Sequence, residues 1–321
     1  MIEDDIILSQ TKATINHEYN TNVTCDDGLK FTDTVDVFVD NVKLTSGVTW
    51  NKTSDTAGSL KIDKSQITST NLIIDFKTEE VNISVPFTIT NIYGHNMELW
   101  IGYSGEYNAT TSSRNLEYCV NGGEWEQYTW QRHSSQEGWL AYPIAFPANS
   151  SIQFRGVNND TGWSDENNIF FFSPEKYDGP SDFDCNVSGN IMSLIYGTDF
   201  ENQNTIPSKR CFYSFFDNHS GQSLRVKSAK NLVLPATDLT DECYIYMFLD
   251  QSIEYAPRIL PSETATKYCY CEMFGGCDQL VASPNICAKN LYSQSFALSA
   301  LVEMFNNCQC LERVMIQYND K

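Results

Sequence analysis

Polar and apolar residues alternate in short runs through the first part of the chain, from about residue 11 to residue 92. Alternation with a period of two predicts half-buried β-strands, because successive side chains of a strand point to opposite faces. Turn formers separate the runs at the spacing that is typical of a small antiparallel sandwich of immunoglobulin type. We therefore expect residues 1–92 to form an Ig-like β-sandwich, with Trp50 in its core and four of the runs as strands: 34–40 (TVDVFVD), 59–63 (SLKID), 72–76 (LIIDF) and 83–90 (ISVPFTIT).

The section 93–184 continues the strand-like pattern but holds five of the six tryptophans, which makes it the richest source of flat aromatic faces. Residues 116–125 (LEYCVNGGEW) predict a hairpin, in which Asn121 and Gly122 supply the positive φ angles of the turn. Residues 151–155 (SIQFR) predict a further strand, and the stretch from about 173 to 181 has the composition of a linker. These features predict a second, aromatic-rich β domain.

Four six-residue segments recur in the last part of the chain: 211–216 (CFYSFF), 243–248 (CYIYMF), 269–274 (CYCEMF) and 300–305 (ALVEMF). Their starts are 32, 26 and 31 residues apart, which is the range of solenoid repeats. The first, second, fifth and sixth positions are apolar, a spacing that places side chains on one face of a helix. We expect short helices that point these side chains inward, each followed by an extended segment that stacks on its neighbour, in a domain of residues 185–321.

The cysteines allow three interpretations, since Cys269, Cys271 and Cys277 fall within nine residues. A zinc site, with Cys308 and Cys310 as further ligands, requires convergent thiolates, and Cys-X-Cys lacks the usual two-residue spacing. Disulfides are disfavoured because the acidic first residues do not resemble a secretory signal, which indicates folding in a reducing compartment. The favoured interpretation is that small apolar thiols fill successive layers of the repeat core.

The recurring pattern resembles the BspA-like leucine-rich repeat family, which combines the cysteine, the paired aromatic and the Met-Phe positions with a following Leu and an Ala-Pro turn. This chain has Tyr255-Ala256-Pro257 and Ala282-Ser283-Pro284 at such turns, and the resemblance covers about residues 187 to 321. It implies a C-terminal α/β leucine-rich repeat solenoid of BspA-like type. The expected fold class is therefore multidomain, with two antiparallel Ig-like β-sandwiches (1–92 and 93–184) followed by that solenoid (185–321).

Charge excludes several classes of partner. Twenty-one Lys and Arg against 41 Asp and Glu give a formal net charge of −20, which repels phosphate backbones and anionic lipids. Nucleic acid and membrane surfaces are therefore not expected as partners. No apolar segment approaches the roughly 20 residues that a membrane-spanning helix requires.

No catalytic motif emerges from the sequence. The four histidines form no HExxH arrangement, and neither a P-loop nor a GxGxxG fingerprint is present. Any carboxylate pair, such as Glu124 and Glu126, can be nominated for glycosidase chemistry in so acidic a chain, so a solvated strand face is the favoured interpretation. Asp160, Asp165 and Glu166 could hold calcium in a loop, but EF-hand spacing is lacking. We expect no enzyme activity, no cofactor and no metal.

Aromatic side chains supply the candidate binding site. Flat rings stack on the C–H faces of sugars, although most tryptophans of a sandwich serve in packing. Trp125, Tyr128 and Trp130, near the expected hairpin, are the candidate glycan contacts.

The expected function combines this site with the resemblance. Similar layouts occur on bacterial surfaces and in phages of gut Bacteroidetes (crAss-like), and a virion protein needs no export signal. The chain is thus expected to be a virion surface protein, as a head fibre, capsid decoration or tail-associated protein. Residues 1–92 would anchor it to other capsid or tail proteins, and it would attach to a host-surface glycan or protein. A cyclic homo-oligomer such as a trimer is expected. The alternatives are a bacterial cell-surface adhesin and an accessory module of a carbohydrate-active enzyme.

Overall fold

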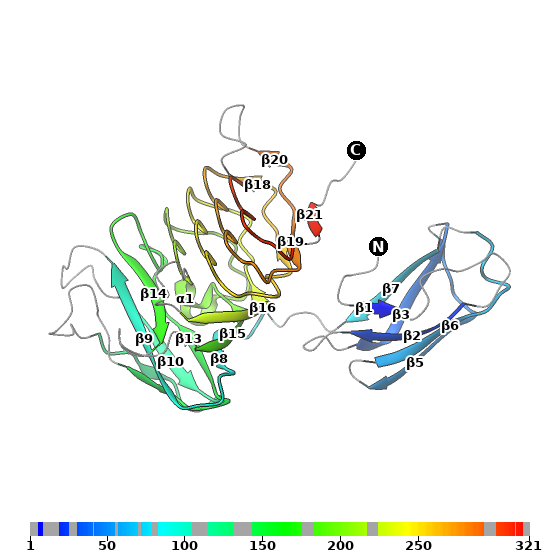
Figure 1. Cartoon of the computed structure of the whole chain (residues 1–321), viewed down its shortest axis with the longest axis horizontal. Coiled ribbons are helices and arrows are strands. Elements are labelled where there is room, and N and C mark those ends of the chain that lie inside the picture. Colours follow the sequence, from blue (N-terminus) through cyan, green and yellow to red (C-terminus); the bar gives the residue numbers. More distant parts are fainter. Residues whose placement is uncertain are drawn as a thin grey trace. The chain divides into compact units, whose positions relative to one another are not determined.

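The structure is a computed structural model, and it describes residues 6–8, 19–25, 31–40, 42–54, 57–69, 72–78, 83–104, 114–130, 143–174, 183–216, 224–291, 300–311 and 313–316. The chain divides into two compact units, Met1–Val81 and Asn82–Lys321. Strands make up nearly all of the regular structure that is described in both units (Figure 1). Among these residues, no helix is long and apolar enough to cross a lipid bilayer.

The first unit consists of two antiparallel sheets, with the strand orders β1-β2-β6-β5 and β4-β3-β7. Tyr19, Val37 and Leu60, which come from both sheets, share its small core. Trp50, expected in this core, lies over Gly58 of the neighbouring strand and is partly buried at the margin of the core. The strands are β1 (Ile6–Leu8), β2 (Tyr19–Cys25), β3 (Phe31–Val39), β4 (Val42–Lys43), β5 (Val48–Ser54), β6 (Ala57–Ile62) and β7 (Leu72–Thr78).

The second unit begins with two sheets that pack around a single large core. The larger sheet has the order β11-β10-β13-β8-β15-β16, and the smaller has the order β12-β9-β14. Phe172 of the smaller sheet lies 5.8 Å from Phe87 and 4.8 Å from Phe154 of the larger sheet, between ring centroids. The strands are β8 (Phe87–Asn91), β9 (Met97–Ser104), β10 (Glu117–Val120), β11 (Glu126–Gln127), β12 (Ile144–Phe146), β13 (Ser151–Arg155), β14 (Ile169–Pro174), β15 (Asp184–Asn190) and β16 (Arg225–Val233).

The larger sheet changes from antiparallel to parallel pairing at β15, which pairs with β8 on one side and with β16 on the other. Parallel bridges lead from Ser228 of β16 through Tyr255 to Ala282 of β19, and β17, β19 and β21 continue the parallel order. The sheet thus runs across residue 185, where the sequence predicts a domain boundary. The added strands are β17 (Ile259–Leu260), β18 (Thr264–Ala265), β19 (Ala282–Ile286), β20 (Asn290–Leu291) and β21 (Arg313–Ile316), and β18 pairs with β20.

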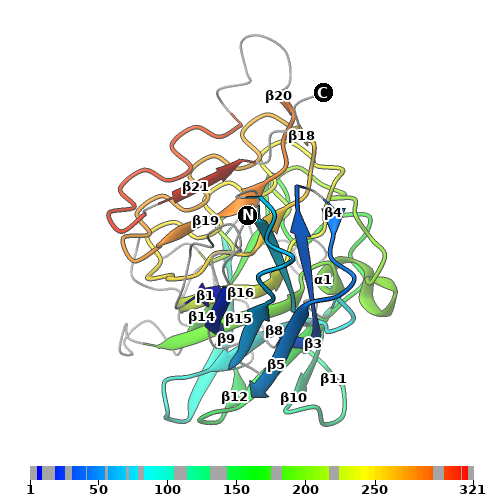
Figure 2. The same ribbon diagram turned by 90° about the vertical axis from the view of Figure 1, so that its right-hand side faces the viewer.

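Two views show the coils of the last part stacked in chain order (Figures 1 and 2). Residues 300–311 and β21 lie at the end of the stack that is away from the six-stranded sheet.

The expected fold class is wrong, because an α/β leucine-rich repeat solenoid does not form. The described residues contain one α-helix, α1 (Ser193–Tyr196), and one short 3₁₀-helix, η1 (Gly197–Asp199), and both lie outside the recurring segments. The remaining regular structure is β-strand in several small sheets. In place of the α/β solenoid that the sequence predicts, the chain is mostly β, and the recurring segments are successions of turns.

These segments, here called turn segments one to four, span residues 209–216, 241–251, 267–277 and 300–308. Every fourth residue has a positive φ, as at Glu242, Tyr246 and Asp250 of turn segment two (58°, 57° and 56°). An α-helix cannot contain such residues, because a left-handed residue turns its N–H away from the i−4 carbonyl. The N–H groups of Tyr244 and Phe248 donate instead to the carbonyls of Cys269 and Met273 in the next segment, at 3.0 and 2.9 Å.

The alternate N–H groups close each turn within its own segment. Met247 N–H donates to the Tyr244 carbonyl and Gln251 N–H to the Phe248 carbonyl, both at 3.2 Å. Backbone groups inside the stack are thereby paired without any helix, as burial requires.

Aromatic rings stack from one turn segment to the next. Phe216, Phe248, Phe274 and Phe305 form one column, with successive centroid distances of 5.4, 5.4 and 5.7 Å. Phe212, Tyr244 and Tyr270 form a second column, at 5.7 and 5.9 Å. The four apolar positions of turn segments one to three are thus buried, as the sequence predicts, on a backbone that it does not predict.

Candidate functional site

An open pocket of about 310 Å³ lies on the second unit, beside β10 and β11. Tyr128 and Ile144, which are 4% and 3% exposed, form its buried floor. Its remaining lining combines a carboxylate, an amide and a hydroxyl with further ring surface. The lining residues are Tyr118, Glu126, Gln127, Tyr128, Thr129, Pro143 and Ile144.

A hairpin positions this lining. β10 pairs with β11 in antiparallel register, with Tyr118 opposite Glu126, and the turn between them has φ angles of 52° at Asn121 and 69° at Gly122. The hairpin and its Asn-Gly turn are therefore confirmed. β13, predicted at 151–155, supports the other edge of β10 and has these bounds.

Hydrogen bonds fix the polar groups of the pocket. The Tyr118 hydroxyl donates to Oε2 of Glu126 at 2.8 Å, and Gln127 Nε2 donates to the Leu116 carbonyl at 2.8 Å. Burial raises the pKa of the Tyr118 phenol, and the hydrogen bond to Glu126 adds to this shift. The phenol therefore stays a donor at neutral pH, while Glu126 and Thr129 are exposed at the rim.

The three predicted glycan contacts lie in different surroundings. Tyr128 lines the pocket as part of its buried floor. Trp130 packs edge-on against Tyr128 at 4.9 Å, and its Nε1 donates to the Arg114 carbonyl at 2.6 Å, so it supports the floor from behind. Trp125 is half-buried, and the guanidinium carbon of Arg155 lies 4.0 Å from its ring centroid.

Sequence reasoning missed Tyr118, Glu126 and Thr129 as members of one site. The signal was present in part, because an Asn-Gly turn brings β10 beside the residues that follow it. A two-residue turn at Asn121 and Gly122 would place Tyr118 opposite Trp125, whereas the observed partner is Glu126, one residue further on.

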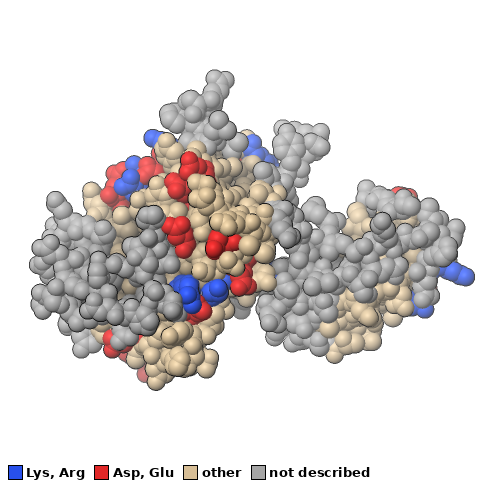
Figure 3. All heavy atoms as spheres, viewed as in Figure 1, with Lys and Arg blue, Asp and Glu red and all other residues tan. Residues whose placement is uncertain are grey.

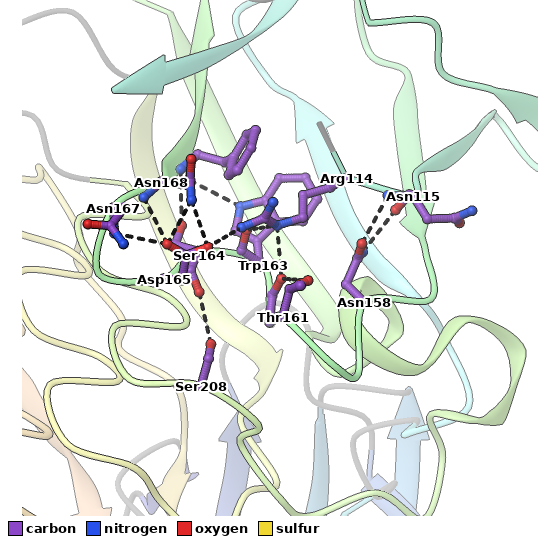
Figure 4. A network of polar contacts seen from close by, with 12 residues as sticks. Arg114, Asn115, Asn158, Thr161, Trp163, Ser164, Asp165, Asn167, Asn168 and Ser208 are labelled. Carbon is purple, nitrogen blue, oxygen red and sulfur yellow. Dashed lines mark hydrogen bonds and ion pairs between the residues drawn. The ribbon is translucent and has the colours of Figure 1, made fainter. Parts of the chain in front are cut away.

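A buried polar network holds the segment behind the pocket (Figure 4). Arg114 is 7% exposed, and its Nε donates to the carbonyls of Gly162 and Trp163 at 3.0 and 2.8 Å. Its Nη2 forms an ion pair with Asp165 at 2.8 Å, and its guanidinium lies 4.5 Å from the Phe170 ring centroid. The network thereby fixes the loop 158–168 and the start of the hairpin together.

Two of the candidate calcium ligands, Asp165 and Glu166, take part in ion pairs of this loop. Asp165 faces Arg114 and also accepts from the backbone N–H groups of Asn167 and Asn168, at 2.9 and 3.0 Å. Glu166 forms an ion pair with Lys209 at 2.5 Å. Over the described ranges, no group of three or more His, Cys, Asp or Glu residues could hold a metal ion.

The repeat cysteines lie inside the stack of turn segments. Cys211, Cys243 and Cys269 are fully buried at the same place in turn segments one to three, and Ala300 takes this place in the fourth. Burial raises the pKa of the Cys211 and Cys269 thiols to about 12. The thiols are therefore protonated at neutral pH and act as small core groups.

Comparison with known proteins gives no relative for this chain: no family model, no curated protein and no solved structure matches it.

Proposed function

We propose that the chain is a non-enzymatic adhesion protein that binds a host-surface glycan in the pocket beside β10 and β11. One observation carries the proposal, namely an open pocket whose lining combines the side chains of Tyr128, Pro143 and Ile144 with hydroxyl, amide and carboxylate groups. Sugars present both kinds of surface, C–H faces and hydroxyl groups, so such a lining complements them.

The binding role is favoured over glycoside hydrolysis by the lining. Glycoside hydrolysis uses two carboxyl groups across the scissile bond. The described lining contributes one, Glu126, whose Oε2 already accepts from Tyr118. Glu126 is then a hydrogen-bond acceptor for sugar hydroxyls.

Glu126→Gln tests the proposal on a panel of bacterial surface polysaccharides, with binding followed by isothermal titration calorimetry. The amide is neutral and changes the pairing with Tyr118, so we expect affinity for the bound polysaccharide to fall at least tenfold, about 1.4 kcal/mol. Glu124→Gln is the matched control, because Glu124 is exposed on the same turn and does not line the pocket. Equal affinity of the two variants, or release of reducing sugar ends by the parent chain, would contradict the proposal.

The proposed location is the surface of a virion, with capsid or tail proteins as partners and assembly in the host cytoplasm. Detection of the chain by mass spectrometry in purified phage particles supports this location. Detection only in bacterial envelopes supports the alternative, a bacterial cell-surface adhesin.

A further inference from the structure

Turn segment four exposes a row of backbone donors. In turn segment three, the N–H groups of Tyr270, Glu272, Phe274 and Gly276 donate to carbonyls of turn segment four, at 2.7 to 3.0 Å. The corresponding N–H groups of turn segment four belong to Leu301, Glu303, Phe305 and Asn307. None of these four N–H groups donates a hydrogen bond to any described residue.

The same end of the stack exposes part of an aromatic column. Phe305 stacks on Phe274 at 5.7 Å and 7°, and no ring among the described residues covers its other face. Phe305 and Leu301 are half-buried. Donors and apolar surface therefore lie on one face, here called the open face, which is defined by Leu301, Glu303, Phe305 and Asn307.

We infer that the open face is a docking surface for a polypeptide segment of a partner protein, which adds to the stack as a further turn segment. Turn segments one to four form three successive interfaces, which show what fits such a face. Each interface supplies a row of carbonyl oxygens at every second residue and an aromatic ring in the column that ends at Phe305. Addition of a segment to an unpaired backbone edge is a recurring mode of protein recognition.

A second copy of the chain does not fit this face. A two-fold contact that placed the row against its own copy would set donors against donors. A head-to-tail contact would need the carbonyl row of turn segment one. That side is covered, because Cys211 O accepts from Ser164 N–H at 2.8 Å and Phe215 packs against Trp163 and Phe172.

Charge defines the partner further. Acidic residues of one coil pair with basic residues of a neighbouring coil, as in Arg210–Glu242 at 2.6 Å and Lys289–Glu263 at 2.5 Å. On the face shown in Figure 3, acidic and basic side chains accordingly lie beside one another. Glu303 is exposed, and its described contact is with Asn306 Nδ2 at 3.3 Å. The partner segment should therefore carry Lys or Arg opposite Glu303.

Two synthetic peptides test this inference on the full chain. The parent peptide has the sequence of residues 267–291, which forms one complete coil. The lysine peptide has the same sequence with the substitution Glu272→Lys. Residue 272 of the peptide would lie opposite Glu303, because residues 272 and 303 occupy equivalent positions in turn segments three and four. We expect the lysine peptide to bind at least tenfold more tightly than the parent peptide, measured by fluorescence anisotropy.

Charge reversal in the chain should invert the preference. Glu303→Lys is expected to bind the parent peptide more tightly than the lysine peptide, whereas Glu201→Lys, an equal charge change at an exposed site outside the turn segments, should leave the preference unchanged. Binding should also slow hydrogen exchange of the Leu301, Glu303, Phe305 and Asn307 amides. Absence of peptide binding, or binding without this protection, overturns the inference. Protection of these amides in the concentrated chain alone, together with a dimer in sedimentation, shows that the occupant is a second copy and overturns the partner assignment.

Discussion

At the scale of single residues, one position in each of turn segments two to four binds the coil before it. Cys277 Sγ donates to the Phe248 carbonyl and Cys308 Sγ to the Phe274 carbonyl, each at 3.0 Å. The equivalent residue of turn segment two is Gln251, which is 1% exposed and donates from Nε2 to the carbonyls of Phe216 and Leu224. The side chain three residues after the column phenylalanine is therefore a recurring link between coils.

Gln251→Leu should destabilise the protein strongly. Its Oε1 also accepts from Val226 N–H at 2.7 Å, so the substitution leaves three buried backbone groups without their side-chain partner. We expect the free energy of unfolding to fall by about 3 kcal/mol in urea denaturation. Gln279→Leu, at an exposed position of the next coil, should change it by less than about 0.5 kcal/mol. Equal effects of the two substitutions would show that the Gln251 contacts contribute little.

At the scale of elements, the turn segments depend on residues with positive φ at every fourth position. Asp250, Gly276 and Asn307 occupy equivalent places in successive segments, with φ of 56°, 70° and 60°. Asp and Asn tolerate this conformation better than most residues, and Gly does so without strain. Gly276 has a second role, because a Cβ there would lie 1.9 Å from Asp250 Oδ1.

Gly276→Ala should therefore lower the free energy of unfolding by more than the positive φ alone explains. Gly94→Ala is the matched control, since Gly94 has a φ of 82° and its Cβ would meet nothing within 4 Å. We expect losses of unfolding free energy of about 1 kcal/mol for Gly94→Ala and about 3 kcal/mol for Gly276→Ala, measured by urea denaturation. Losses of the same size would mean that the Asp250 side chain moves aside freely.

At the scale of the whole molecule, buried thiols couple stability to pH. Burial raises the pKa of Cys211 and Cys269 to about 12, and it raises the pKa of Cys243 and Cys277 well above the ordinary value. An unfolded thiol titrates near pH ~8.5. Above that pH the unfolded chain releases protons that the folded chain keeps, so the free energy of unfolding falls as pH rises. Below pH ~8.5 the thiol contribution is fully present.

Cys269→Ala tests this coupling, because Ala300 already occupies the equivalent place in turn segment four. Each buried thiol contributes a slope of about 1.4 kcal/mol per pH unit between its unfolded and folded pKa values. Between pH 9.5 and 11, the variant should therefore lose stability less steeply than the parent by about that amount. The measurement is urea denaturation at several pH values under reducing conditions. Identical slopes would show that the Cys269 thiol ionises in the folded state.

Local sequence patterns predict several of the observed side-chain positions and turns. The inward positions of turn segments two and three, the hairpin turn at Asn121 and Gly122, and strand 151–155 follow from local periodicity and turn chemistry. The pocket could be predicted only in part. The sequence predicts Tyr128 as a member of the site, but the one-residue shift that sets Tyr118 opposite Glu126 depends on the conformation of the loop rather than on its composition.

The sequence by itself determined which side chains are buried in the stack. Apolar residues at the first, second, fifth and sixth positions are removed from water whether the backbone is a helix or a succession of turns. Only the tertiary structure decided that backbone. Over six residues, this spacing fits a helix of 3.6 residues per turn as well as turns that repeat every four residues. The choice depends on where the N–H groups find acceptors, and here the acceptors lie 25 to 31 residues away in the next coil, as Tyr244 with Cys269 and Phe212 with Cys243 show.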